Sequence, residues 1–309
     1  MSDGHAEDMA EPGFEAEFPS SQEQVVWKHV EGSEPSFEEL VRHHGLTWVR
    51  SGDSSRAEFD DFQHFYVLRL YSLTWVKDTA QVAATPVVVY VMGSTMLSWA
   101  PERLEPAWQV RETLTQNPDW VLSSARLLYY FLDALVGELF PFLDRINERI
   151  DRMEQRAFRA HRQQIVQAEI FRVKREVFRT RRIFASMRDA ISQLVRYWST
   201  HNGDDSFYYM ELYDHMIRLF DTVDTYRELI NSALDLSLSS VSNRLNEIVK
   251  TLTLVTTVLL PASLMAALYG MNFDYLPLSH YKWGFLVIIG IIGCISLGLY
   301  WMFRRRRWL

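Results

Sequence analysis

Two long uncharged segments near the end of the chain constrain its fold most strongly. No charged residue lies between Lys250 and Asp274 or between Lys282 and Arg304, which leaves uncharged runs of 23 and 21 residues. A helix needs roughly 20 apolar residues to cross the hydrocarbon core of a bilayer. We therefore predict a transmembrane domain over residues 251–309. It comprises a helix at about 251–269, an outer loop at 270–282, a second helix at about 283–303 and a basic tail at 304–309.

The composition of the whole chain is that of a soluble protein with a short membrane-embedded part. Of 309 residues, 48% are hydrophobic and 23% are charged. The formal net charge of −7 argues against nucleic acid as a partner. The single cysteine, Cys294, excludes internal disulfides and cysteine-cluster metal sites. Phosphate-binding glycine loops, nucleophile elbows and zinc-site motifs are missing from the sequence, so we do not expect an enzyme or a cofactor.

Charge around the apolar runs predicts the topology. The tail Arg304–Arg307 follows the second run, and Arg244 and Lys250 precede the first. Because positive charge accumulates on the cytoplasmic side, both termini are expected inside and the connecting loop outside. Residues 1–22 are acidic and lack the apolar core of a signal peptide, so they are expected to be disordered. A bacterial or archaeal inner membrane is the simplest location for this multi-pass protein.

Residues 23–117 have the pattern of a cytoplasmic α/β domain. Segments rich in aromatic and β-branched residues predict strands at 25–30, 64–73, 86–92 and 96–99. Helices are expected at 35–44 and 101–114. The fold class is therefore an α+β domain followed by long helices.

Residues 118–250 are expected to form a helical hairpin and a stalk helix. Pro141 suggests a kink or a helix boundary. Residues 145–188 hold thirteen Arg or Lys against five Asp or Glu, whereas residues 204–235 hold eight acids and two bases. The basic face either binds phosphate or anionic lipid, or is solvated and paired with the acidic helix. We prefer the second interpretation, because opposite charges joined by a turn suit an antiparallel hairpin.

A single helix is expected from about Ser206 to Tyr269, since proline is missing between Asn202 and Leu260. Apolar residues along it alternate steps of 4 and 3, the pattern of helices that pack against copies of themselves. A neighbouring seam carries small and hydroxyl-bearing side chains: Asn246, Val249, Thr253, Thr256, Leu260, Ser263 and Ala267. Spacing alone fits two interpretations equally well, ordinary helix packing and the wall of a pore.

The residues around the outer loop resemble those of the CorA family of divalent-cation transporters. The family signature is a Tyr-Gly-Met-Asn loop between two C-terminal membrane helices, which is present here as Tyr269, Gly270, Met271 and Asn272. The agreement covers about 70 C-terminal residues and is looser upstream. It extends through Ser242–Glu247, Lys250, Leu252-Thr253, Pro261, Lys282-Trp283-Gly284 and Arg307-Trp308-Leu309.

The resemblance implies a funnel-shaped homopentamer with five first membrane helices around one axis. Asn272 would then ring the outer mouth and bind a hydrated cation, and Asn246 would lie near the inner membrane boundary. The hydrophobic gate of the family is similar to Val249, Leu252 and Leu260. With this resemblance, the pore interpretation of the seam becomes the preferred one. Gly270 is expected to end the helix with a positive φ.

The outer loop departs from the family pattern. Many members carry an acidic Met-Pro-Glu stretch where this chain has Leu276-Pro277-Leu278, so Asp274 is the only acid there, and His280 is added. His280 fits a softer ion, pH sensitivity or a plain interfacial residue. The regulatory metal sites of the family use cytoplasmic acids between subunits, for which Glu211 and Asp214 are candidates.

Three functions follow as expectations. The leading one is a channel-like transporter of Mg²⁺, with Co²⁺ or Ni²⁺ as further ions. A close rival is a Zn²⁺ transporter that resembles the ZntB branch, with or without proton coupling. The third is a membrane-anchored scaffold or sensor that conducts nothing.

Overall fold

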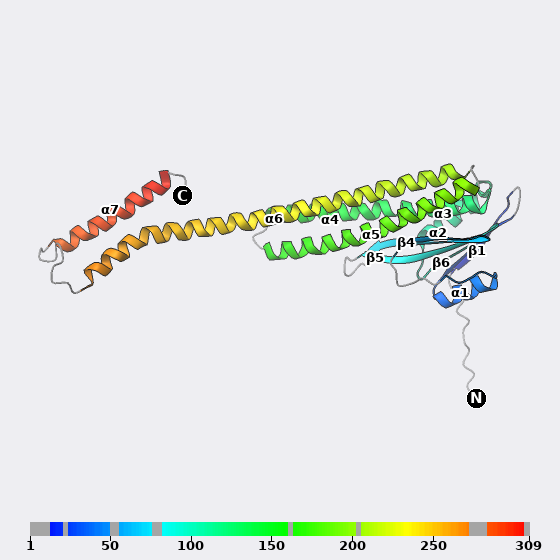
Figure 1. Ribbon diagram of the computed structural model, residues 1–309, viewed down its shortest axis with the longest axis horizontal. Coiled ribbons are helices and arrows are strands. Elements are labelled where there is room, and N and C mark those ends of the chain that lie inside the picture. The colour runs from blue at the N-terminus through cyan, green and yellow to red at the C-terminus, as the bar shows by residue number, and fades with distance from the viewer. Residues whose placement is uncertain are drawn as a thin grey trace, which may run out of the picture. The chain divides into compact units, whose positions relative to one another are not determined.

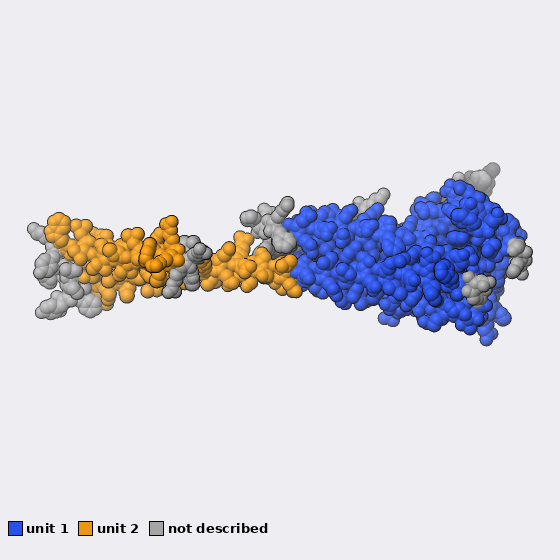
Figure 2. Space-filling view, turned by 90° about the horizontal axis from the view of Figure 1, so that it is seen from above, with its two compact units in different colours: residues 1–234 blue, residues 235–309 orange. Residues whose placement is uncertain are grey.

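A computed structural model describes residues 13–20, 24–49, 56–75, 82–159, 163–201, 205–271 and 283–305. The chain divides into two compact units, residues 1–234 and residues 235–309, which Figure 2 colours separately.

The first unit contains a six-stranded mixed sheet (Figure 1). Its strands are β1 (Gly13–Phe18), β2 (Val25–Glu31), β3 (Glu58–Phe62), β4 (Phe65–Trp75), β5 (Val82–Met92) and β6 (Thr95–Ala100). They are arranged in the order β1-β2-β6-β5-β4-β3. Only β2 and β6 pair in parallel, and the other neighbours are antiparallel.

Two hydrophobic clusters cover the two faces of this sheet. Alternate residues of β5 divide between them: Val88 and Tyr90 belong to one cluster, and Val87 and Val89 belong to the other. Helix α1 (Glu34–His43) contributes Phe37 to the first cluster. The helices that follow the sheet contribute to the second, larger cluster. The central strand is therefore buried on both faces, which explains its continuous apolar sequence.

The helices after the sheet are α2 (Glu105–Gln116), the 3₁₀ turn η1 (Pro118–Trp120), α3 (Ser124–Gly137), α4 (Leu139–Arg159) and α5 (Gln163–His201). A boundary expected at Pro141 lies slightly earlier, between Gly137 and Leu139. Pro141 instead occupies the first turn of α4, where its missing N–H costs no hydrogen bond. The basic segment 145–188 is divided between α4 and α5, a second break that the sequence pattern does not indicate.

Helix α6 (Ser206–Tyr269) has the bounds that the sequence predicts. Side-chain hydrogen bonds connect the first half of α6 to α5. Lys174 Nζ lies 3.1 Å from Asn231 Oδ1, and Arg181 Nε lies 2.7 Å from Asp224 Oδ1. As the residue number rises on α5, it falls on α6, so the two helices are antiparallel. The Arg181–Asp224 pair supports the interpretation of a basic helix paired with an acidic one.

The second unit contains the C-terminal part of α6 and helix α7 (Gly284–Arg305). Both helices contain segments that are long and apolar enough to cross a membrane, by length and composition. Pro261 lies inside α6 without ending it. The two C-terminal apolar helices of the predicted fold class are therefore present.

Two strands differ from the sequence-based expectations. Residues 13–18 form β1, although the segment 1–22 was expected to be disordered. Gly13 approaches β2 so closely that an added Cβ would lie 2.3 Å from the His29 carbonyl oxygen. Strand β3 was not expected either, because its sequence EFDDF is acidic. Both are edge strands. Their sequences have a weak preference for the β conformation, and pairing with the neighbouring strands stabilises them.

Candidate functional site

The predicted pore-lining residues on α6 are the seven seam residues and Leu252, and all of them are exposed in the single chain. All eight predicted pore-lining residues lie in the last 24 positions of α6, and all are solvent-accessible. Val249, Leu252 and Leu260 have exposed fractions of 59%, 65% and 58%. Apolar side chains this exposed need a cover of lipid or of other copies. The full set is Asn246, Val249, Leu252, Thr253, Thr256, Leu260, Ser263 and Ala267.

The two seam threonines donate their hydroxyl hydrogens to backbone carbonyls of their own helix. Thr253 Oγ1 donates to the Val249 carbonyl at 2.8 Å, and Thr256 Oγ1 donates to the Leu252 carbonyl at 2.8 Å. A hydroxyl that donates in this way keeps its oxygen lone pairs available as acceptors. The exposed edge of the seam therefore offers acceptor oxygens, which suit water molecules around a cation.

The end of α6 supports the beginning of the signature loop. Gly270 N–H donates to the carbonyls of Ala266 and Ala267 at 3.0 and 3.2 Å, one residue beyond the end of the helix at Tyr269. The expected positive φ at Gly270 is wrong, since the positive-φ glycines among the described residues are Gly32, Gly45 and Gly93. An added Cβ would instead lie 3.3 Å from the Ala266 carbonyl oxygen. Close approach of the backbone thus favours glycine there.

Other predicted mouth residues lie outside the described residues. They are Asn272, Asp274 and His280. Met271 is described and half exposed, and its N–H lies 3.4 Å from the Leu268 carbonyl oxygen. The structure therefore positions the first three residues of the signature.

The candidate regulatory acids lie on the first half of α6. Glu211 and Asp214 are both exposed. His215, the next residue, lies 3.5 Å from Asp133 on α3. Burial and the nearby charge of Glu211 raise the pKa of Asp133, while His215 partly opposes this rise. Among the residues described, no group of three or more metal-ligating side chains is suitably placed to hold an ion.

Sequence reasoning missed the contact between Asp133 and His215. The two residues are 82 positions apart, and neither belongs to a recognisable ligand motif. Only the packing of α3 against α6 brings them together.

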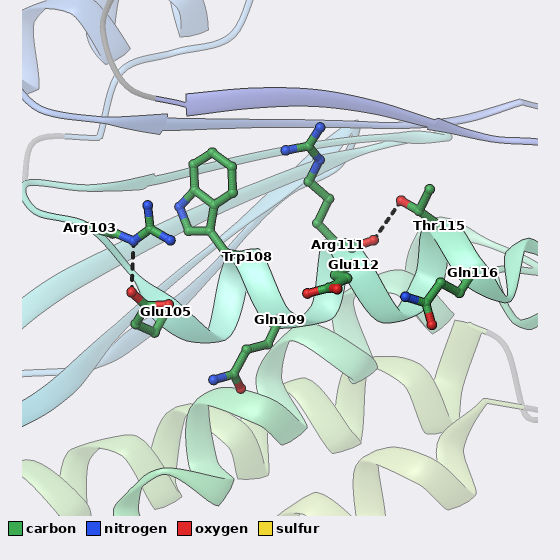
Figure 3. A pocket seen from close by; sticks show the side chains of 8 residues that line it. All are labelled: Arg103, Glu105, Trp108, Gln109, Arg111, Glu112, Thr115 and Gln116. Carbon is green, nitrogen blue, oxygen red and sulfur yellow. Dashed lines mark hydrogen bonds and ion pairs between the residues drawn. The ribbon is translucent and has the colours of Figure 1, made fainter.

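A buried polar network connects β2 with α2. Glu31 Oε1 accepts hydrogen bonds from Leu104 N–H at 2.9 Å and from Trp108 Nε1 at 2.8 Å. On the solvent side, Trp108 faces an open hollow along α2, with the guanidinium carbons of Arg103 and Arg111 at 4.9 and 5.4 Å from its ring (Figure 3). Arg103 is also paired with Glu105 at 2.8 Å. Glu112 also lines the hollow, so its two arginines are balanced by two glutamates, and its lining includes no predicted site residue.

These features define a class of protein in which a mixed α+β unit is followed by one very long helix and a second apolar helix. A sequence profile of the CorA-like Mg²⁺ transporter protein family matches residues 22–305. The chain belongs to this family.

Individual relatives agree with this assignment. The cobalt/magnesium transport protein CorA of Thermotoga maritima is 29% identical over 257 residues, which cover 82% of this chain and 73% of that protein. The complete CorA magnesium transporter of Methanocaldococcus jannaschii superposes with a TM-score of 0.79 at 21% identity, over 92% of each chain. The ZntB cytoplasmic domain of Vibrio parahaemolyticus matches 75% of this chain and 99% of its own length, with a TM-score of 0.61 at 15% identity.

Proposed function

We propose that the protein transports divalent cations across the cytoplasmic membrane, with hydrated Mg²⁺ as the main ion and Co²⁺ or Ni²⁺ as further substrates. Family membership supports cation transport as the class of function. The observation that carries the pore assignment is the exposed seam on α6, in which an amide and hydroxyls alternate with apolar residues. A polar stripe of this kind is costly against lipid and favourable around a shared water-filled axis.

Five copies of α6 would surround that axis in a homopentamer, as the family resemblance implies. Asn272 would ring the outer mouth and Asn246 the inner end. Mg²⁺ loses its hydration shell reluctantly. Neutral amide and hydroxyl oxygens can accept hydrogen bonds from that shell without removing it. Val249, Leu252 and Leu260 would form the apolar constriction, which closes by excluding water.

The topology follows from charge. Lys250 precedes the first apolar segment, and Arg304 and Arg305 end the second. Both termini are therefore placed in the cytoplasm and the signature loop outside. The domain assignment that accompanies this topology is a cytoplasmic α/β domain at 23–117, a hairpin and stalk at 118–250, and a transmembrane domain at 251–309.

A second candidate is Zn²⁺ transport, with or without proton coupling. Its support is the likeness of 75% of the chain to a ZntB cytoplasmic domain and the His280 in a loop with one acid. In either case Asp274 would supply the charge at the mouth. In a transporter of this family, Glu211 and Asp214 would serve as regulatory metal ligands between subunits. A non-conducting scaffold or sensor is the third candidate.

Uptake into proteoliposomes tests these functions. Purified full-length protein is assayed with Mg²⁺, Co²⁺, Ni²⁺ and Zn²⁺, with and without a pH gradient. We expect Asn272→Ala to lower Mg²⁺ flux or selectivity by roughly tenfold or more, because a hydrogen bond to a charged group contributes about 1.5–3 kcal/mol. Asn147→Ala makes the same chemical change on α4 and should leave the flux unchanged.

Each outcome distinguishes one candidate. Zn²⁺ uptake driven by a proton gradient without Mg²⁺ flux would favour the ZntB-like function. Wild-type protein that moves no ion, together with an Asn272→Ala variant that behaves identically, would favour the scaffold.

A further inference from the structure

The second unit contains a groove between its two apolar helices. The groove has a volume of about 340 Å³. The Tyr300 hydroxyl is the only polar side-chain group in its lining, and the other lining side chains are aliphatic or aromatic. The lining residues are Leu254, Val255, Val258 and Leu259 of α6 with Tyr300 and Phe303 of α7.

One end of this groove is flanked by basic residues from both helices. Lys250 lies four residues before Leu254 on α6, and Arg304 lies four residues after Tyr300 on α7. Residues four apart occupy the same face of a helix. Helices α6 and α7 run in opposite directions (Figure 1), and both Lys250 and Arg304 lie within one turn beyond the lining residues of their own helix, so we place them at the same end of the groove. Arg305 is not part of this basic end, because its guanidinium carbon lies 5.3 Å from the centroid of the Trp301 ring.

We propose that this groove binds an anionic phospholipid of the cytoplasmic leaflet. One acyl chain lies along the apolar lining, and the phosphate lies between Lys250 and Arg304. Basic pockets between membrane helices at the cytoplasmic side suit anionic headgroups, and an arginine guanidinium matches the geometry of phosphate oxygens. The inference rests on the membrane placement given above.

Charge complementarity favours a lipid over a second copy of the chain in this groove. A neighbouring membrane helix would cover the apolar lining equally well. Its apolar segments, residues 251–273 and 283–303, contain no Asp or Glu that could pair with Lys250 and Arg304, and its Glu247 lies one helical turn from its own Lys250. An anionic phospholipid satisfies the apolar lining and the basic end together.

Native mass spectrometry of the detergent-solubilised full-length protein tests the proposal. The protein is titrated with equal amounts of dioleoyl phosphatidylglycerol and dioleoyl phosphatidylcholine. Wild type should retain phosphatidylglycerol preferentially. Lys250→Gln with Arg304→Gln should lower this preference on the order of tenfold. Arg244→Gln with Arg305→Gln removes the same charge outside the groove and should keep the preference.

The remaining variants separate the contribution of the lipid headgroup to binding from that of the acyl chain. Val258→Trp should fill the groove and lower retention although both basic residues remain, whereas Lys250→Arg with Arg304→Lys should behave as wild type. Equal losses in the two glutamine pairs would overturn the specific site in favour of diffuse attraction. An unaffected Val258→Trp variant would overturn the acyl position. Ion flux is assayed on the same variants, so loss of lipid preference with intact flux is distinguishable from failure of the transport proposal.

Discussion

At the residue scale, a chain of hydrogen bonds in the first unit favours the neutral form of the His29 imidazole. Trp27 Nε1 donates to Ser98 Oγ at 2.8 Å, and Ser98 Oγ lies 2.8 Å from His29 Nδ1. His29 Nε2 lies 3.3 Å from Glu31 Oε1. A neutral imidazole that accepts from Ser98 and donates to Glu31 satisfies every bond in the chain. All of these side chains are buried.

This network predicts a pH-dependent stability. Burial lowers the pKa of His29 below 6.5, and the charge of Glu31 only partly opposes the shift. Between the folded and unfolded pKa values of His29 the unfolded chain binds more protons, so stability falls as the pH drops below about 6.5. Thermal unfolding of the full-length protein should show a lower midpoint at about pH 5 than at about pH 7.

Two histidine variants isolate this effect. His29→Gln removes the titrating group and should flatten the pH dependence, whatever its effect on the midpoint at neutral pH. His64→Gln changes an exposed residue and should leave the slope as in wild type. A His29→Gln variant with the wild-type slope would contradict the assignment.

At the element scale, one ion pair links α3 to Asp205, the residue just before α6, and another links α5 to α6, and the burial of these two pairs differs. Arg126 Nη2 on α3 lies 3.0 Å from Asp205 Oδ1, with side-chain exposures of 14% and 10%. Tyr208 covers the same guanidinium at 3.7 Å from its ring centroid. Arg181 and Asp224 are about one-third exposed. Solvent screens the second pair more strongly.

We predict that the two pairs contribute unequally to stability. Asp205→Asn leaves the Arg126 charge poorly paired in a buried position and should lower the free energy of unfolding by about 2–3 kcal/mol. Asp224→Asn is the matched control and should cost less than about 1 kcal/mol. Thermal midpoints of both variants, compared with wild type at one protein concentration, provide the measurement. Equal shifts would show that burial does not decide the contribution.

At the scale of the whole molecule, the second unit cannot cover its own apolar surface. Leu245, Ile248 and Val255 on α6 are each at least half exposed in the single chain, as are Phe285 and Leu297 on α7. A bilayer covers lipid-facing residues. Leu245 and Ile248 belong to the apolar stripe of α6 and lie before the uncharged segment that begins at residue 251. Other copies of the chain are therefore the natural cover for these two residues.

We propose that this assembly is a homopentamer, as the family resemblance implies. Native mass spectrometry or light scattering of the detergent-solubilised protein should give five times the mass of one chain. The same measurement in a denaturing detergent gives the monomer mass as the control. A monomeric or dimeric species that retains full cation flux would contradict a pore shared by five copies.

The strength of sequence-based prediction differed between parts of this protein. Local patterns located the apolar helices and the bounds of α6 from Ser206 to Tyr269, because hydropathy and helical periodicity act over neighbouring residues. The signature Tyr269–Asn272 indicated the family for the same reason. Edge strands β1 and β3 escaped prediction, since their pairing partners rather than their own sequences stabilise them.

The sequence by itself determined which segments can enter a membrane and which face of α6 is polar. Only the tertiary structure decided which distant residues meet: Glu31 with Leu104 and Trp108, Asp133 with His215, and Leu254–Leu259 with Tyr300 and Phe303 around one groove. The reason is physical. Hydropathy is a property of each segment, whereas a buried hydrogen bond or a shared groove depends on how segments far apart in the chain pack together.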